Sequence, residues 1–482
     1  MAGEGAGHPV GGDDEHPEPG SVREPESQPD RRRRRLLGAG SAAAVAAAFG
    51  LRVDGRALWR SCATAGQQPG SSAPPLPDGP IRWIWTGATT STSADVRLRP
   101  TDGSAAARLA LSASAELTHP HWVDGTRADG SPVVRCTATG LEPDTTYHYA
   151  PEVDGVLDRG AGGSFRTFPE GPSSFLVAFG GCAQTGSNRA VFDAIADLEP
   201  TLFGVIGDFH YADVDTDDVA RFHDALDRVL RSPAQSALYR STSVAYVWDD
   251  HDYGTDNADR TAPSRPAAMA AYRQYVPSYE LAGPTTSIHQ AFTIGRVRFV
   301  MTDARSERDP SGLPDDADKS MLGPDQKAWL KAELVRASST HALVVWIQPV
   351  PWTGVAEVGG DSWGGYSTER RELADFLVDE GITNLVMVSG DAHMVAIDDG
   401  TNTNLSDRGR LDTPTGGFPL LHVAALDQVG SRKGGPYSHG EFPGGARFGT
   451  VEVIDDGSTI DVVLAGRDWR GTPFVEHRVT VR

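Results

Sequence analysis

The stretch TLFGVIGDFHYAD, residues 201–213, combines an apolar strand with a polar tail. Apart from the first threonine, the opening part TLFGVI is apolar, which is typical of a strand buried on both faces. The tail contains Asp208, His210 and Tyr211, three side chains that can bind metal ions. In α/β sheets, functional sites form where buried strands end. The stretch therefore predicts an α/β domain with a polar site at one edge of its sheet.

Three further apolar strands end in side chains of the same kinds. The strands SFLVAFG, SVAYVW and TNLVMVSG are followed by Cys182, by Asp249–Asp252, and by Asp391 with His393. Helical patterns such as NRAVFDAIADLE lie between strands, which is the alternation of α/β domains. The sequence thus predicts an α/β domain over residues 173–482 whose strand ends share one edge.

Many of these side chains are carboxylates, which repel one another when they converge. Ionising all of them at one edge costs free energy unless cations are bound, so bound metal ions are expected there. Aspartate, histidine, cysteine and tyrosine together suit a divalent or trivalent transition ion, and the excess of carboxylates suits a harder ion such as calcium. Each residue alone has a plainer explanation as a turn residue, a buried thiol or a packed histidine. The metal interpretation depends on the repetition at four strand ends.

The segment before this domain has a different pattern. Residues 81–170 contain short alternating strands separated by Gly/Asp turns, which predicts a small antiparallel β-sandwich. Within it, LEPDTTYHY at residues 141–149 resembles the corner of fibronectin type III domains, and Cys136 is expected in the packed core. Residues 66–80 are rich in Pro, Gly and Ser and form the predicted linker.

The first 65 residues are typical of a disordered tail followed by an export signal. Residues 1–30 lack apolar periodicity, and Arg31–Arg35 precede the short Ala/Gly-rich apolar stretch Leu36–Leu51. This layout resembles a twin-arginine leader, which predicts recognition by the twin-arginine export machinery and an extracellular or cell-envelope location. A nuclear-type basic patch and a retained anchor helix are the alternatives. No other segment reaches the length of a membrane span, so none is expected in the mature protein.

Charge and cysteine content exclude other classes of protein. The 44 Lys and Arg against 65 Asp and Glu give a net charge of −21, so nucleic-acid binding is not expected. Three cysteines cannot form a disulfide framework, and they lack the spacing of a zinc site. A single Cys136–Cys182 bridge stays open if Cys62 is removed with the leader.

Seven segments of the α/β domain match those of one known family, in the same order. They are FGGCAQ (179–184), IGDFHYAD (206–213), VWDDHDYG (247–254), MTDARSERDP (301–310), MLGPDQKAWLKAEL (321–334), SWGGYSTERREL (362–373) and VSGDAHM (388–394). Because of these segments, the chain resembles the PhoD-like (alkaline phosphatase D) metallophosphatases of the calcineurin-like superfamily. The resemblance implies an α/β fold with a two-sheet core flanked by helices and preceded by the small all-β sandwich.

The resemblance also implies a multinuclear metal site, typically of ferric iron and calcium. Cys182, Asp208 and Tyr211 match the iron-side ligands of the family. Asp208 is further expected to bridge to a second metal. Another divalent metal is the alternative for either ion.

Three more ligands are expected at the later strand ends. Asp250 stands where the wider superfamily has a metal-binding asparagine, and Asp391 and His393 correspond to the ligands after the last matching strand. Two departures leave these residues in place: GDFHY replaces the common GDYIY, and DDHD replaces the usual DDHE. They leave the exact metal occupancy open.

By the same resemblance, the chain is expected to be a phosphoric ester hydrolase that cleaves phosphate monoesters, diesters or both through in-line attack by a metal-bound hydroxide. His251, one residue beyond a ligand, is the expected general acid. Arg305 is the expected phosphate clamp, because its planar fork matches phosphate oxygens. A salt bridge from Arg305 to Asp303 or Glu307 is the alternative.

Two other functions compete with this one. GDSWG at residues 360–364 matches the G-x-S-x-G nucleophile elbow of serine esterases, with Ser362 as the nucleophile. An elbow needs a strand directly before the serine, and here a Gly-rich loop is expected instead. The second alternative is a non-catalytic, secreted surface-binding protein with a degenerate phosphatase domain. Ligand-type residues at all four strand ends disfavour it.

Overall fold

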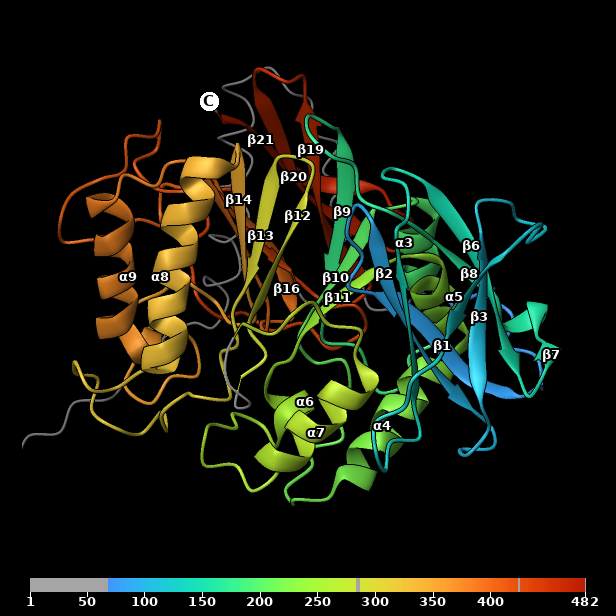
Figure 1. Ribbon diagram of the computed structural model, residues 1–482. Coiled ribbons are helices and arrows are strands. Elements are labelled where there is room, and N and C mark those ends of the chain that lie inside the picture. The colour runs from blue at the N-terminus through green and yellow to red at the C-terminus, as the bar shows by residue number, and fades with distance from the viewer. Residues whose placement is uncertain (1–67, 283–286, 424, 482) are drawn as a thin grey trace, which may run out of the picture. The chain divides into compact units, whose positions relative to one another are not determined.

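The computed structural model describes residues 68–282, 287–423 and 425–481 (Figure 1). The predicted tail and export signal, residues 1–65, lie outside the described residues. Within the described ranges, no helix is both long enough and apolar enough to cross a membrane.

The larger sheet has a parallel centre made of the strands that the sequence indicates. β9 (Phe175–Gly180), β10 (Leu202–Ile206) and β11 (Val244–Val247) run parallel, with Gly204 opposite Ala245. These strands are almost wholly buried, as expected for a sheet covered on both faces. Antiparallel strands continue the sheet beside β9, namely β19 (Arg447–Asp455), β20 (Ile460–Asp468) and β21 (Pro473–Val481).

A second sheet also has a parallel centre. It consists of β13 (Val297–Met301), β14 (Leu343–Gln348), β15 (Leu385–Ser389) and β17 (Leu420–Val423). Antiparallel strands lie at its edges, namely β12 (Gln290–Ile294), β16 (Met394–Asp398) and β18 (Glu441–Pro443). The short turn between β15 and β16 contains Asp391 and His393.

The two sheets pack face to face around one hydrophobic core. The rings of Phe175 on β9 and Phe299 on β13 have centroids 6.4 Å apart, and Val205, Val345 and Val451 belong to the same core. Burial of such side chains is the main favourable contribution to folding. The predicted α/β core with two sheets is therefore confirmed.

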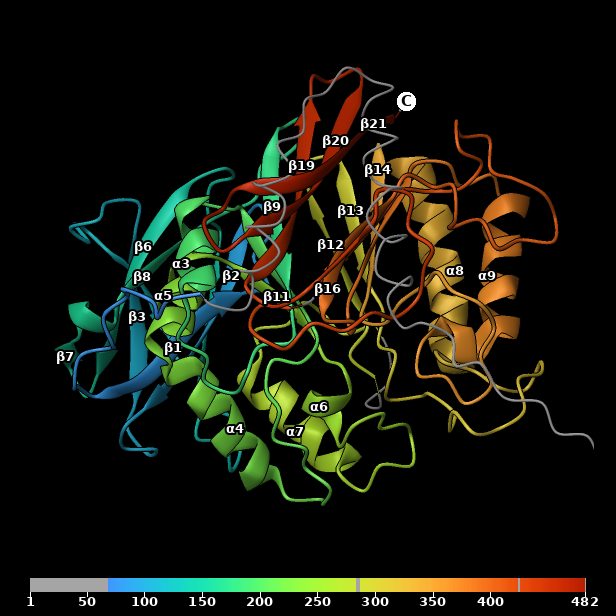
Figure 2. The ribbon, with the colours of Figure 1, turned by 180° about the vertical axis from the view of Figure 1, so that it is seen from behind.

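Helices flank this core, as Figures 1 and 2 show. α8 (Gly323–Thr340) and α9 (Ser367–Asp379) lie side by side and share a core with Trp346 of β14. The other α-helices of the described residues belong to the larger sheet and its loops, namely α3 (Ala190–Asp197), α4 (Val219–Arg231), α5 (Pro233–Ser241), α6 (Asp250–Tyr253) and α7 (Arg265–Tyr275).

The predicted β-sandwich is present before the α/β core. A small antiparallel sheet faces the strands β1, β2 and β5, and the cluster between them includes Cys136 and Tyr149. Tyr147 accepts a hydrogen bond from the backbone N of Glu142 at 3.0 Å, the contact of a tyrosine corner. The strands are β1 (Ile81–Gly87), β2 (Ser93–Pro100), β3 (Ala107–Ser112), β4 (His121–Asp124), β5 (Val134–Thr139), β6 (Thr146–Val153), β7 (Val156–Leu157) and β8 (Gly163–Arg166), with the short helix η1 (Arg159–Ala161).

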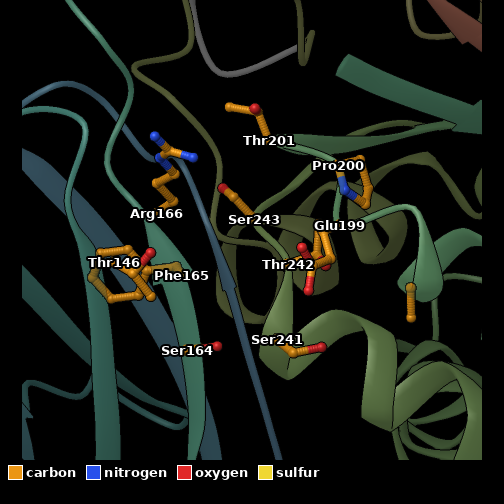
Figure 3. A pocket seen from close by; sticks show the side chains of 11 residues that line it. Thr146, Ser164, Phe165, Arg166, Glu199, Pro200, Thr201, Ser241, Thr242 and Ser243 are labelled. Carbon is orange, nitrogen blue, oxygen red and sulfur yellow. The ribbon is translucent and has the colours of Figure 1, made fainter. Parts of the chain in front are cut away.

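The sandwich is joined to the core through a shared sheet. β1 pairs with β11 in parallel, Gly87 opposite Val244, so β1, β2 and β5 extend the larger sheet. Near this junction lies a polar cavity of about 430 Å³ whose lining includes Arg166, Glu199 and Thr242 (Figure 3). None of the strand-end residues lines this cavity, so it is separate from the site described next.

Candidate metal centre

The structure brings the predicted strand ends together. Cys182 follows β9, Asp208 follows β10 and His393 follows β15, and one ligand atom of each lies within 4.8 Å of the others. Gly207 allows this approach, because a Cβ there would lie 2.4 Å from the Cβ of Asp249 at the end of β11. Its φ of +77° also favours glycine.

Three of the predicted ligands have a left-handed backbone conformation. Cys182 has a φ of 51°, Asp208 one of 53° and Asp391 one of 75°. Such angles cost energy for residues other than glycine and persist only where the surroundings hold them. Their concentration at these strand ends is typical of a functional site.

Four donors form what we call the first ligand group: Cys182, Asp208, Tyr211 and His393. The Oδ2 of Asp208 lies 3.2 Å from the Cys182 Sγ and 2.6 Å from the Tyr211 Oη. The Tyr211 Oη lies 3.3 Å from the Nε2 of His393. The Nδ1 of His393 lies 2.8 Å from the carbonyl oxygen of Val429. Because that carbonyl can only accept, Nδ1 carries the proton and Nε2 keeps its lone pair for a metal.

The second ligand group consists of the carboxylates of Asp208 and Asp250, and the imidazole of His251 lies beside it. One ligand atom of each of these three residues lies within 4.8 Å of the others. The Nδ1 of His251 lies 2.5 Å from the Oδ1 of Asp213, so the imidazole is held in one orientation. Burial alone would lower the pKa of His251, but the carboxylates around it, Asp250 above all, raise it to about 9. The sequence predicts a general acid here, and the structure places it within reach of the ligands.

Asp208 shows that these groups fit a metal. Its carboxylate is buried and belongs to both groups, yet its Oδ1 has no hydrogen-bond partner among the described residues. A buried carboxylate oxygen without a partner is costly. Burial raises the pKa of Asp208 well above its usual range, and Asp250 and Asp252 raise it further. Burial and the carboxylates of Asp208 and Asp391 likewise raise the pKa of the Cys182 thiol. A cation would offset both effects and supply the missing partner.

Asp391 differs from the other predicted ligands. Both of its carboxylate oxygens accept hydrogen bonds from Lys433 Nζ, at 2.8 and 2.9 Å. Its backbone carbonyl oxygen lies 3.6 Å from the Cys182 Sγ. Burial raises the pKa of Asp391 to about 6, although Lys433 acts in the opposite direction. Asp391 thus lies at the edge of the centre, and its carboxylate is paired with the ammonium group of Lys433.

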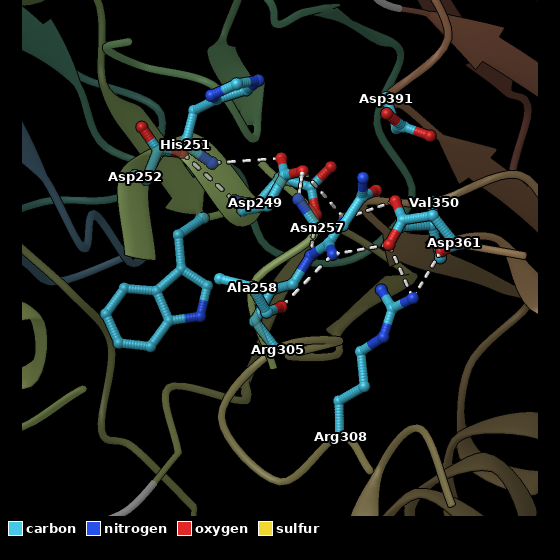
Figure 4. A network of polar contacts seen from close by, with 12 residues as sticks. Asp249, His251, Asp252, Asn257, Ala258, Arg305, Arg308, Val350, Asp361 and Asp391 are labelled. Atoms are coloured by element: carbon cyan, nitrogen blue, oxygen red, sulfur yellow. Dashed lines mark hydrogen bonds and ion pairs between the residues drawn. The ribbon is translucent and has the colours of Figure 1, made fainter. Parts of the chain in front are cut away.

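Arg305 lies in a buried network of ion pairs beside the centre (Figure 4). Its Nε donates to Asp249 at 2.5 Å, and its two Nη atoms donate to Asp361 at 2.9 and 3.1 Å. Arg308 donates to the same carboxylate of Asp361 at 2.6 Å. The side chains of both arginines are 0% exposed.

This geometry differs from both sequence-based expectations for Arg305. The fork predicted to clamp phosphate is occupied by Asp249 and Asp361 and does not reach solvent. The alternative salt bridge is not formed either: Asp303 accepts from the backbone N of Arg305 at 3.0 Å, and Glu307 pairs with Arg265. Arg305 therefore positions the end of β11 and the loop that contains Asp361.

The residues around Ser362 do not form a nucleophile elbow. Residues 349–362 are a loop after β14, and no strand directly precedes the serine. Its Oγ accepts a hydrogen bond from the backbone N of Gly364 at 3.2 Å and caps the short helix η2 (Trp363–Tyr366). The serine thus has a structural role in this loop.

Two other side chains lie outside the ligand groups. His210 is buried against Phe222, with ring centroids 6.2 Å apart, and burial lowers its pKa to about 4. Cys136 is buried in the sandwich, and both Cys136 and Cys182 are free thiols. The Cys136–Cys182 bridge that the cysteine count left open is therefore not formed.

Three residues of the site are not predicted from the sequence. Asp213, which holds His251, lies in the quoted stretch after β10, so a signal was present. Asp361 lies in the GDSWG pattern, which indicates a serine nucleophile and not a partner for arginine. Lys433 lies in the segment SRKGGP, which has no periodicity and offers no local signal.

Two solved structures share this fold. A structure of PhoD is similar to the chain with a TM-score of 0.65 and 16% identity, over 86% of this chain and 94% of that one. The purple acid phosphatase PPD1 from yellow lupin (Lupinus luteus) gives a TM-score of 0.58 and 13% identity, over 84% of this chain and 75% of that one. At such identities the likeness shows the fold alone. It confirms the predicted metallophosphatase core.

Sequence comparison identifies the family. Residues 178–416 match the model of the PhoD-like phosphatases. Over 312 residues the chain is 25% identical to the alkaline phosphatase D of Bacillus subtilis (strain 168). This alignment covers 54% of this chain and 53% of that protein. The chain thus spans about half the length of this curated relative. The match spans β10 to β16 and includes every strand end of the metal centre, and by it this part of the chain belongs to the PhoD-like phosphatase family.

Proposed function

We propose that this chain is a metal-dependent phosphoesterase that hydrolyses phosphate monoesters, diesters or both. The observation that carries the proposal is Asp208, which belongs to both ligand groups and keeps a buried oxygen without a partner among the described residues. A carboxylate in this position suits two cations at once. Membership of the PhoD-like phosphatase family supports the same class of reaction.

The two ligand groups suit different ions. The first offers a thiol and a phenol that become anionic ligands on binding, and these suit ferric iron. The second offers the carboxylates of Asp208 and Asp250, and we assign calcium to it because calcium prefers oxygen ligands. When bound, such cations neutralise charge on the phosphoryl oxygens and lower the pKa of an attacking water.

The chain's own residues orient the reaction. Asp213 holds the Nδ1 of His251, which leaves Nε2 to protonate the leaving oxygen. Val429 holds the Nδ1 of His393 in the same manner. Arg305 holds Asp249 and Asp361 through buried ion pairs and does not contact the substrate. His251 is therefore the proposed general acid.

Elemental analysis and a substrate panel test this function. The purified protein should contain iron and calcium, and it should hydrolyse p-nitrophenyl phosphate, its bis ester or both. A chelator should abolish turnover, and the same metals should restore it. Turnover that survives complete removal of metal would contradict the proposal, and a metal-free, inactive protein would favour the surface-binding alternative. Inhibition by a serine-directed phosphonate without sensitivity to chelators would favour the esterase.

We further propose that the chain is exported by the twin-arginine route. The support is the sequence alone, namely Arg31–Arg35 followed by the Ala-rich apolar stretch. Replacing these five arginines by lysine should leave folded precursor in the cytoplasm, because the charge is kept while the arginine signal is lost. Fractionation and immunoblotting measure the distribution. Undiminished secretion would indicate the general secretory route or another signal.

A further inference from the structure

Near the metal centre, the described residues include the lysine and arginine side chains of Arg305, Arg308 and Lys433, and of these three only Lys433 reaches solvent. The side chains of Arg305 and Arg308 are 0% exposed, whereas that of Lys433 is 41% exposed. Both arginines are occupied by the carboxylate of Asp361. A substrate that approaches from solvent can therefore meet Lys433 but neither arginine.

The ammonium group of Lys433 is only partly used. It has three N–H donors, and two of them bind the carboxylate oxygens of Asp391 at 2.8 and 2.9 Å. No described residue other than Asp391 accepts a hydrogen bond from this Nζ. The Asp391 side chain is 8% exposed, so the carboxylate of this pair is buried while the lysine side chain stays accessible to solvent.

The Lys433 ammonium is also close to the ligand groups. The backbone carbonyl oxygen of Asp391 lies 3.6 Å from the Cys182 Sγ, so the pair adjoins the first group. Asp250 and Asp361 are near enough to act electrostatically on Lys433. Figure 4 shows Asp391 near the network around Asp361. These contacts place the Asp391–Lys433 pair beside the first ligand group.

We propose that Lys433 is the phosphate-binding cation of this site and that Asp391 is its positioning residue. The third N–H of Lys433 donates to a non-bridging phosphoryl oxygen, while Asp391 fixes the side chain from behind. Lysine binds phosphate as a compact point charge. This assignment rests on the proposed function. It replaces Arg305, the residue expected from the sequence, by a residue 128 positions further along the chain.

The test compares Lys433→Ala with Arg432→Ala. Arg432 is the matched control because it is the neighbouring cation, is 63% exposed, and pairs with Glu441 at 3.5 Å. Loss of a charged hydrogen bond should weaken inorganic phosphate binding and raise the KM for p-nitrophenyl phosphate by about 10- to 100-fold in Lys433→Ala. Arg432→Ala should match the wild type in both. Titration calorimetry with inorganic phosphate measures binding independently of turnover.

A second variant guards against misfolding, because Lys433→Ala leaves Asp391 buried without a partner. Lys433→Gln keeps a hydrogen-bond donor for Asp391 but has no charge, so it should keep the wild-type melting temperature and metal content and lose phosphate affinity. Wild-type phosphate affinity in both variants would overturn the proposal. Metal loss in parallel with phosphate affinity would also overturn it, because Lys433 would then act through the metal. If the wild type binds phosphate but hydrolyses no ester, the proposed function fails while the binding comparison still decides the role of Lys433.

Discussion

The Asp208→Asn variant should lose metal from both ligand groups and more than about 100-fold of phosphoesterase activity. Mutating a residue that only supports a metal ligand typically costs about 10- to 100-fold. Asp208 belongs to both groups directly, so its loss should exceed that range. Elemental analysis and turnover of p-nitrophenyl phosphate measure the two effects.

Asparagine is the right replacement because it should not disturb the fold. Asp208 has a φ of 53°, and asparagine is among the few residues that tolerate this conformation. The change also removes a buried charge whose Oδ1 has no partner among the described residues. The metal-free variant should therefore melt no lower than the metal-free wild type. A clear drop in its melting temperature would mean that Asp208 serves the fold more than the metal.

Cys182→Ser separates the two ligand groups. Cys182 belongs only to the first group, so its replacement should remove iron and any thiolate charge-transfer band while calcium remains. Cys136→Ser is the control, because that thiol is buried in the sandwich. Equal loss of activity in the two serine variants would contradict the assignment of Cys182 as a ligand.

The parts of the site that the sequence predicts are those fixed by local geometry. A buried strand holds the residues after it rigidly, so Cys182, Asp208 and His393 could be located from apolar runs alone. The structure adds the reason for their precision, namely left-handed backbone at Cys182 and Asp208 and a glycine between closely packed strand ends. These are short-range effects, which a sequence pattern can indicate.

The parts that the sequence does not predict depend on long-range contacts. Lys433 reaches Asp391 from a loop 42 positions away, and nothing in SRKGGP indicates that partner. Arg305 carries the right chemistry for phosphate, but its burial follows from Asp249 and Asp361, each 56 positions away. A residue type shows which ligands a side chain can bind, whereas its burial depends on which distant segments pack against it.

The His251→Ala variant should lose about 10²- to 10⁴-fold of activity on alkyl phosphates and little on p-nitrophenyl phosphate. A general acid contributes about this much where the leaving group needs a proton. An alkoxide is a poor leaving group and needs one, whereas p-nitrophenolate departs without protonation. Rates for the two substrate classes, measured on the same enzyme preparation, give the difference directly.

Metal content must be measured beside these rates, because a ligand atom of His251 also lies within 4.8 Å of those of Asp208 and Asp250. A residue that acts only in the transition state leaves metal content unchanged. Asp213→Asn is the companion variant. It weakens the hydrogen bond between the Nδ1 of His251 and the Oδ1 of Asp213, which are 2.5 Å apart, and it leaves the imidazole in place. It should show the same leaving-group dependence with a smaller loss.

Two results would reassign His251. Equal losses on alkyl and p-nitrophenyl phosphates would mean that it binds the phosphoryl group or supports the fold, because both substrates need those roles alike. Metal loss in proportion to activity would place it among the ligands of the second group, and Asp213 would then orient a ligand. Only a leaving-group-dependent loss at constant metal content assigns the proton to Nε2 of His251, because a proton for the leaving oxygen matters in the transition state and not for holding the ion.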